Sequence, residues 1–284
     1  MLIDLDPMIF LWSFLGPVIS LLIAFPITVV WKDNSLVDIG WTLGFMSMAW
    51  ISFILNGSWS SPRQVIITIL VTVWGIRLLT HYIVRKMIRK VEDVRFAEYR
   101  KNWTSKFYLK TFLIIFLPQM FLVYIIGLPV VFANSFVDTS TLTNFGIVLL
   151  VLGGIVWLEG FLIESTADFQ LMKFRSNPEN KGKILNKGLW KYSRHPNFFG
   201  ETEQWWGIFI IAITYAFDNY PTARYLGVGW LTIIGPLLLT FILIKFSGIP
   251  TLEKDGVLKG REGYDEYLET TSVFIPWFPK KKKE

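Results

Sequence analysis

Apolar residues in this chain gather in seven long runs that are separated by polar connections. Each run approaches the ~20 residues that an α-helix needs to cross the hydrocarbon core of a bilayer. The runs cover Ile9–Trp31, Leu36–Leu55, Val65–Val84, Phe112–Phe132, Phe145–Glu164, Gly200–Phe217 and Tyr225–Phe246. The sixth is short and opens with acidic residues, so we expect its first turns to be buried in protein rather than in lipid. The pattern predicts an all-α, polytopic membrane protein with seven transmembrane helices.

Basic residues are concentrated in three polar segments, which follow the third, fifth and seventh runs. The opposite connections hold little positive charge beyond Arg63 and Arg224. Because loops rich in Lys and Arg stay on the cytoplasmic side, the N-terminus is predicted outside and the C-terminus in the cytoplasm. The first residues lack a basic stretch and a small-residue cleavage site, so no removable signal peptide is expected.

The amino-acid composition limits the kinds of catalysis and metal binding that are possible for this chain. The chain has 284 residues, of which 52% are hydrophobic and 17% aromatic. It has no cysteine, which excludes thiol catalysis, disulfides and Cys-ligated metal. Its two histidines, His81 and His195, are too few for a His-rich metal centre, so no metal site is expected. The net charge of +6 is explained by membrane topology, and no nucleic-acid partner is expected.

Ionisable residues inside the runs all fall in the predicted cytoplasmic half. Asp38 lies in the first turns of the second run, Tyr82 near the end of the third, and Glu164 at the end of the fifth. Asp168 follows Glu164 at a spacing that places both on one helix face. A transporter would place such groups near the midplane. The distribution favours a cavity that opens to the cytoplasm, with a polar cytoplasmic half and an apolar outer half. Such a cavity suits a water-soluble cofactor that meets a lipophilic substrate.

A phenol beside a carboxyl group could polarise a substrate carbonyl, and Tyr82 with Asp38 is the best-placed pair by depth. Two simpler interpretations compete. Tyr82 is also typical of the aromatic belt at a membrane interface. Asp38 is also typical of an acid in the first turn of a helix that Asn34 or Ser35 could cap.

A dinucleotide needs cations for its phosphates and acceptors for its ribose hydroxyls and carboxamide. Arg175, Arg194 and Lys254 are candidate phosphate ligands. Glu164 and Asp168 could accept from hydroxyls, and the amide of Asn197 could meet a carboxamide. The glycine fingerprint of a Rossmann domain is absent from the sequence, so helices and loops would have to hold the nucleotide.

Several blocks together resemble the steroid 5α-reductase superfamily, particularly its bacterial branch. They are "IESTADFQLMKFR" (163–175), "GLWKYSRHPNFFGETEQWWG" (188–207), "SGIPTLEK" (247–254), "GYDEYLETTSVFIP" (263–276) and the early "NSLVDIGWTLG" (34–44). The resemblance implies one integral-membrane reductase domain over 1–284, with most cofactor motifs in 134–284. It also implies NADPH as cofactor and reduction of a carbon–carbon double bond conjugated to a ketone, in a 3-oxo-Δ4 steroid or a similar lipophilic substrate.

The same resemblance suggests roles for individual residues. "THYIVR" matches the family segment whose tyrosine polarises the substrate carbonyl, which indicates Tyr82. The family's acidic partner is a glutamate preceded by glutamine, and Asp38 takes that place here. The residues implied in cofactor binding are Glu164, Asp168, Arg175, Tyr192, Arg194, His195, Asn197, Glu201, Lys254 and Tyr264.

"RHPNFFGE" also fits the pattern of isoprenylcysteine and phospholipid methyltransferases, which bind S-adenosylmethionine in a similar helical pocket. That enzyme class is the main alternative, with a lipid carrier, a scaffold and a transporter behind it. The expected partners are a steroid-like enone and membrane lipid, to whose anionic headgroups Lys280–Lys283 could bind. No obligate protein partner is evident. The expected location is a bacterial inner membrane, with the active site open to the cytoplasm.

Overall fold

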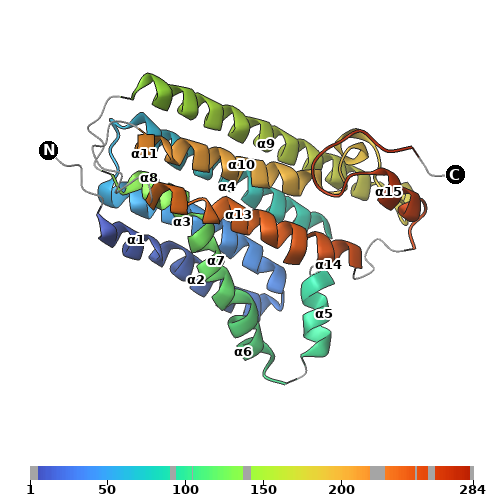
Figure 1. Ribbon diagram of the computed structural model, residues 1–284. Coiled ribbons are helices and arrows are strands. Elements are labelled where there is room, and N and C mark those ends of the chain that lie inside the picture. Colours follow the sequence, from blue (N-terminus) through green and yellow to red (C-terminus); the bar gives the residue numbers. More distant parts are fainter. Residues whose placement is uncertain are drawn as a thin grey trace. The chain divides into compact units, whose positions relative to one another are not determined.

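The computed structural model describes residues 6–89, 94–103, 105–136, 142–217, 228–246, 248–254 and 260–281 (Figure 1). Over these residues the chain is helical and forms no strand. The α-helices are α1 (Pro7–Ser13), α2 (Leu15–Trp31), α3 (Val37–Asn56), α4 (Pro62–Arg89), α5 (Val94–Asn102), α6 (Phe107–Thr111), α7 (Leu117–Ile126), α8 (Leu128–Asn134), α9 (Asn144–Ser176), α10 (Pro196–Ala212), α11 (Thr214–Phe217), α13 (Ile234–Phe241), α14 (Ile249–Lys254) and α15 (Tyr264–Thr270). Short 3₁₀ segments η1 (Asn34–Leu36), η3 (Pro178–Asn180) and η4 (Gly188–Lys191) and π-helical segments η2 (Phe112–Phe116) and η5 (Ile242–Phe246) complete the described secondary structure.

Within this part of the chain, six helical stretches are long and apolar enough to cross a membrane. They are Pro7–Trp31, Asn34–Asn56, Pro62–Met87, Phe107–Ile126, Asn144–Ser176 and Val228–Glu253. The prediction of an all-helical membrane protein is therefore confirmed.

The predicted sixth run does not appear as one long helix. It is divided between α10 and the short α11, with a turn at Ile213. At this turn the Thr214 hydroxyl donates to the Ile211 carbonyl at 2.8 Å, a local bond that competes with regular helical hydrogen bonding. The fourth run likewise stops at Ile126, before Gly127, and a new helix begins with Pro129 near its start.

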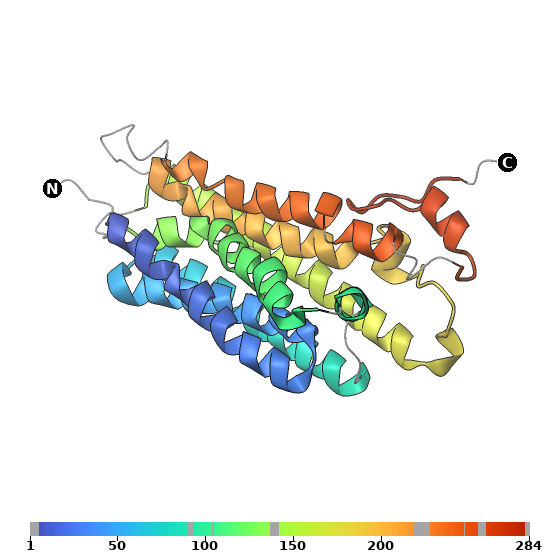
Figure 2. The same cartoon turned by 90° about the horizontal axis from the view of Figure 1, so that it is seen from below.

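The chain divides into two compact units, one of Met1–Gly154 with Ile208–Pro236 and the other of Ile155–Gly207 with Leu237–Glu284. We call them the first and second units. In the first, α2 and α3 lie side by side in both views (Figures 1 and 2). Gly40 permits this approach, since a Cβ there would lie 2.9 Å from the Ala24 side chain. A buried apolar cluster around Leu21 and Phe116 completes the packing.

In the second unit, residues 155–176 of α9 pack closely on residues 196–207 of α10. The contact depends on Gly160 and Gly200, because a Cβ on Gly160 would lie 2.6 Å from the Gly200 carbonyl oxygen. Beyond α15 the chain doubles back, and the Lys280 N–H donates to the Thr270 carbonyl at 2.8 Å (Figure 2). We call Thr271–Lys281 the C-terminal strap.

Candidate functional site

The loop between η4 and α10 carries Arg194 and His195, and it is held by its own side chains. Buried Ser193 accepts a hydrogen bond from the His195 N–H at 3.1 Å and donates its own hydroxyl to the Phe274 carbonyl at 2.7 Å. Pro196 then opens α10, where its fixed φ suits the first helical position. These contacts hold the backbone on both sides of Arg194 independently of the contacts of the Arg194 side chain.

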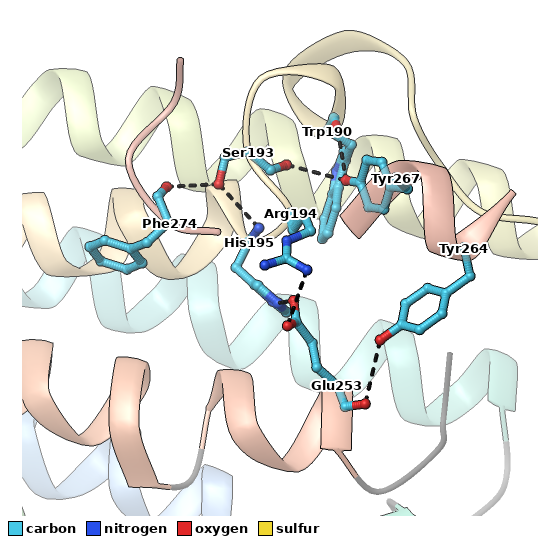
Figure 3. Close-up of polar contacts among 8 residues, drawn as sticks. All are labelled: Trp190, Ser193, Arg194, His195, Glu253, Tyr264, Tyr267 and Phe274. Atoms are coloured by element: carbon cyan, nitrogen blue, oxygen red, sulfur yellow. Dashed lines mark hydrogen bonds and ion pairs between the residues drawn. The ribbon is translucent and has the colours of Figure 1, made fainter. Parts of the chain in front are cut away.

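The carboxylate of Glu253 contacts both basic side chains of this loop (Figure 3). Arg194 Nη1 lies 3.3 Å from Glu253 Oε2, and His195 Nε2 lies 2.8 Å from Glu253 Oε1. The exposed fractions of the Arg194 and Glu253 side chains are only 9% and 16%, so solvent screens this pair far less than a surface ion pair. Glu253 is the charged centre of the arrangement.

Sequence reasoning missed Glu253. The residue lies in the quoted block "SGIPTLEK", directly before the candidate Lys254, but its partners His195 and Arg194 are 58 and 59 residues away in the chain. The available signal was the position of this carboxylate directly beside Lys254, a candidate phosphate ligand. The Lys254 side chain lies outside the described residues, so its predicted role stays a prediction.

Two tyrosines of α15 close one side of the cluster (Figure 3). The Tyr264 hydroxyl donates to the Glu253 carbonyl at 3.4 Å, and the Tyr267 hydroxyl donates to the Trp190 carbonyl at 2.6 Å. Burial raises the pKa of Tyr264, and the nearby Glu253 charge raises it further. Burial also raises the pKa of Tyr267, against a smaller lowering by the Arg194 charge. Both phenols are therefore structural donors near neutral pH.

A second group of polar atoms lies where α9 meets α10. The Gln204 side-chain amide donates to the buried carboxylate of Glu164 at 2.7 Å. Close by in the chain, Asn197 Oδ1, Glu203 Oε2 and Gln204 Oε1 are buried and have no hydrogen-bond partner among the described residues. Buried acceptors are normally satisfied, so these three could accept hydrogen bonds from the donor groups of a bound molecule.

The predicted cofactor residues of the second unit have different surroundings. Asp168 is buried on α9, whereas Arg175 is exposed near the end of that helix. Glu201 is partly buried in α10. The Tyr192 ring meets the Phe278 ring edge-on, with 6.0 Å between their centroids. The structure thus brings Arg194, His195 and Tyr264 together around Glu253.

In the first unit, Arg85 connects the predicted phenol and acid. Its Nη2 lies 3.6 Å from Asp38 Oδ2, and its guanidinium carbon lies 5.2 Å from the centre of the Tyr82 ring. Arg85 is the first residue of the basic segment after the third run, which served in the sequence analysis only to assign the topology. The expected cap was also wrong in detail, since α3 has Leu36 at its N-cap with no side-chain bond, and Asp33 caps η1 instead.

Comparison with protein families adds one match. A model described as "Protein of unknown function (DUF1295)" covers residues 24–271, which is most of the chain. The chain belongs to the DUF1295 family. This family is associated with steroid 5α-reductase-like proteins, and the matched range includes Asp38, Tyr82, Arg194, His195, Glu253 and Tyr264. Neither the curated proteins nor the solved structures contain a match to this DUF1295 protein.

Proposed function

We propose that this protein is an NADPH-dependent membrane reductase that acts on a carbon–carbon double bond conjugated to a ketone, in a lipophilic substrate such as a 3-oxo-Δ4 steroid. The observation that carries the proposal is the set of buried acceptors without partners at Asn197, Glu203 and Gln204. A dinucleotide has donors of the required kind in its carboxamide and its ribose hydroxyls.

The donor and acceptor set of the second unit fits a nucleotide. The buried Nε of Arg194 has no partner among the described residues and could donate to a phosphate. Asn197 and Glu201 would face the nicotinamide end, and Arg175 and Lys254 would add positive charge for the phosphates. NADPH, when bound, would supply the hydride.

In the first unit, Tyr82 would donate its phenolic proton to the substrate carbonyl oxygen as negative charge gathers there, which gives an enol. The enol would then take up a solvent proton at the carbon next to the one that received the hydride, and its O–H proton would return to Tyr82. Arg85, over the Tyr82 ring, would stabilise that charge electrostatically. Asp38 would hold the guanidinium in place through its 3.6 Å ion pair. The chain's own contribution to the reaction is thus proton donation and charge stabilisation.

The topology proposed for this enzyme has seven spans, with α10 and α11 together forming the sixth. The N-terminus would lie outside and the C-terminus in the cytoplasm of a bacterial inner membrane, with the site open to the cytoplasm. The basic segments after the third, fifth and seventh runs support this orientation.

The test is NADPH oxidation by the purified protein in detergent, with progesterone as substrate and the product mass recorded. A gain of two hydrogens that disappears in Tyr82→Phe, while NADPH binding persists, would support the proposal. Asn197→Ala should weaken NADPH binding, and Tyr99→Phe, at an exposed phenol on α5, should change neither property. Binding of S-adenosylmethionine in place of NADPH would contradict the proposal and favour a methyltransferase.

A further inference from the structure

The C-terminal strap exposes large apolar side chains outside any membrane-spanning helix. Ile275, Trp277 and Phe278 have exposed fractions of 60%, 68% and 76%. The strap has no helical structure over 271–281, so the side chains are not one face of an amphipathic helix. These three side chains, within four positions, give the strap an exposed apolar surface that contact with water does not favour.

Hydrogen bonds to the Arg194 loop hold this surface in place. The Arg194 N–H donates to the Ser272 carbonyl at 2.8 Å, and the Trp277 N–H donates to the Tyr192 carbonyl at 2.9 Å. Phe274 also turns inward and packs edge-on against Phe199, with 5.6 Å between ring centroids. These contacts hold the backbone of the strap in place, so its exposed side chains have defined positions.

The depth of the strap follows from its connections within the second unit. Glu253 is the last residue of the candidate span Val228–Glu253, and it pairs with Arg194. The strap is bonded to Arg194 and its neighbours, so it lies at the level where that span ends. Tryptophan and other aromatic residues are enriched at this boundary because they combine apolar rings with polar edges.

Charge indicates which lipid surface the strap would meet. Lys280 and Lys281 are exposed directly after the aromatic residues, and the sequence continues with Lys282 and Lys283, which lie outside the described residues. Lys280 and Lys281, beside an apolar surface, are complementary to anionic headgroups and not to neutral ones, and the sequence adds two more lysines directly after them. This complementarity depends only on the strap and not on the catalytic activity.

We propose that the C-terminal strap is a docking surface for an anionic membrane leaflet. Ile275, Trp277 and Phe278 enter the headgroup region, and the lysines bind lipid phosphates. Because the strap is bonded to the backbone around Arg194, lipid binding also steadies that loop.

The test uses the absence of native cysteine, which lets a single introduced thiol carry a polarity-sensitive bimane probe. The full-length Phe278→Cys protein is labelled and reconstituted in vesicles of phosphatidylcholine, alone or mixed with phosphatidylglycerol. With phosphatidylglycerol present we expect a blue shift of emission and several-fold weaker quenching by acrylamide. High salt, or replacement of Lys280–Lys283 by Gln, should abolish both changes. Glu179→Cys, on exposed η3, is the matched control and should not respond.

Three outcomes would overturn the proposal. An equal shift in both lipids would mean apolar insertion without recognition of charge. No shift in either would mean that the strap stays in water. A shift that follows the protein-to-lipid ratio instead of lipid charge would identify a second copy of the chain as the occupant.

Discussion

His195 Nε2 lies 2.8 Å from Glu253 Oε1, although 58 positions separate the two residues in the sequence. The same carboxylate pairs with Arg194 through its other oxygen. One acid thus joins the loop before α10 to α14, both in the second unit. We therefore expect a substitution of Glu253 to alter the conformation of this loop more than that of any helix.

Replacement of Glu253 by Gln should destabilise the second unit. The substitution keeps the side-chain shape but leaves the Arg194 cation buried without its counter-charge, which typically costs about 3 kcal/mol. Thermal unfolding in detergent, followed by tryptophan fluorescence, should show a lower Tm than the wild type. Glu179→Gln, on the exposed η3 segment, should leave the Tm unchanged. Equal Tm values for both variants would mean that the ion pairs of Glu253 do not contribute to the stability of the second unit.

Gly200→Ala should separate α9 from α10. The added Cβ would lie 2.6 Å from the Glu164 backbone nitrogen, and backbone cannot move aside as a flexible side chain can. Overpacking of this kind costs about 1–3 kcal/mol. Gly154→Ala is the matched control, because its Cβ would meet nothing within 4 Å. Urea unfolding should separate the two variants, and a Gly200→Ala protein as stable as the control would contradict the close packing.

Tyr267→Phe removes the hydroxyl that donates to the Trp190 carbonyl and leaves a buried acceptor without its donor. We expect a loss of about 1–3 kcal/mol. Tyr99→Phe, at an exposed phenol, should cost less than about 0.5 kcal/mol. Amide hydrogen exchange around Trp190 and Ser193 would locate the effect, and it should rise in the first variant alone.

Alkaline titration should weaken the same region. Burial raises the Tyr267 pKa above its ordinary value of 10.0, so the unfolded chain releases this proton at lower pH than the folded protein does. The contribution to stability is therefore complete below pH 10 and decreases as pH rises toward the folded pKa. Tyrosinate absorbance together with Tm measurements should show both effects, and Tyr267→Phe should reduce the pH dependence.

Asp38→Asn should separate activity from stability in the first unit. The Arg85–Asp38 pair is partly exposed at 3.6 Å, so its loss should cost less than about 1 kcal/mol. If Arg85 stabilises charge at Tyr82, kcat should fall with little change in KM. Asp265→Asn, exposed on α15, should retain full activity. A kcat equal to that of the control would remove Asp38 from the proposed machinery.

The helices were predictable because each apolar run satisfies a local requirement, the length of a membrane span. Breaks such as the turn at Ile213 were not, since they depend on single hydrogen bonds that hydropathy does not record. The Gly160–Gly200 contact was missed for a related reason. A glycine in an apolar run signals close packing only once its neighbour helix is known.

The candidate site was predictable where residues cluster in sequence, as Arg194, His195 and Asn197 do. Glu253 and Arg85 were missed because their partners are distant in the chain, and no spacing rule connects residues across a loop of unknown path. The strap was missed because irregular backbone has no hydrophobic period.

The bond between the Ser193 hydroxyl and the Phe274 carbonyl spans 81 residues and has a consequence for biosynthesis. Synthesis runs from the N-terminus, so the ribosome releases residue 274 long after the loop around Ser193 has emerged. Every candidate membrane helix can be inserted while that loop still lacks its closing partners. The nascent chain therefore passes through a stage with its spans in the bilayer and its Arg194 loop unfinished, and the later-translated residues around Phe274 complete the loop.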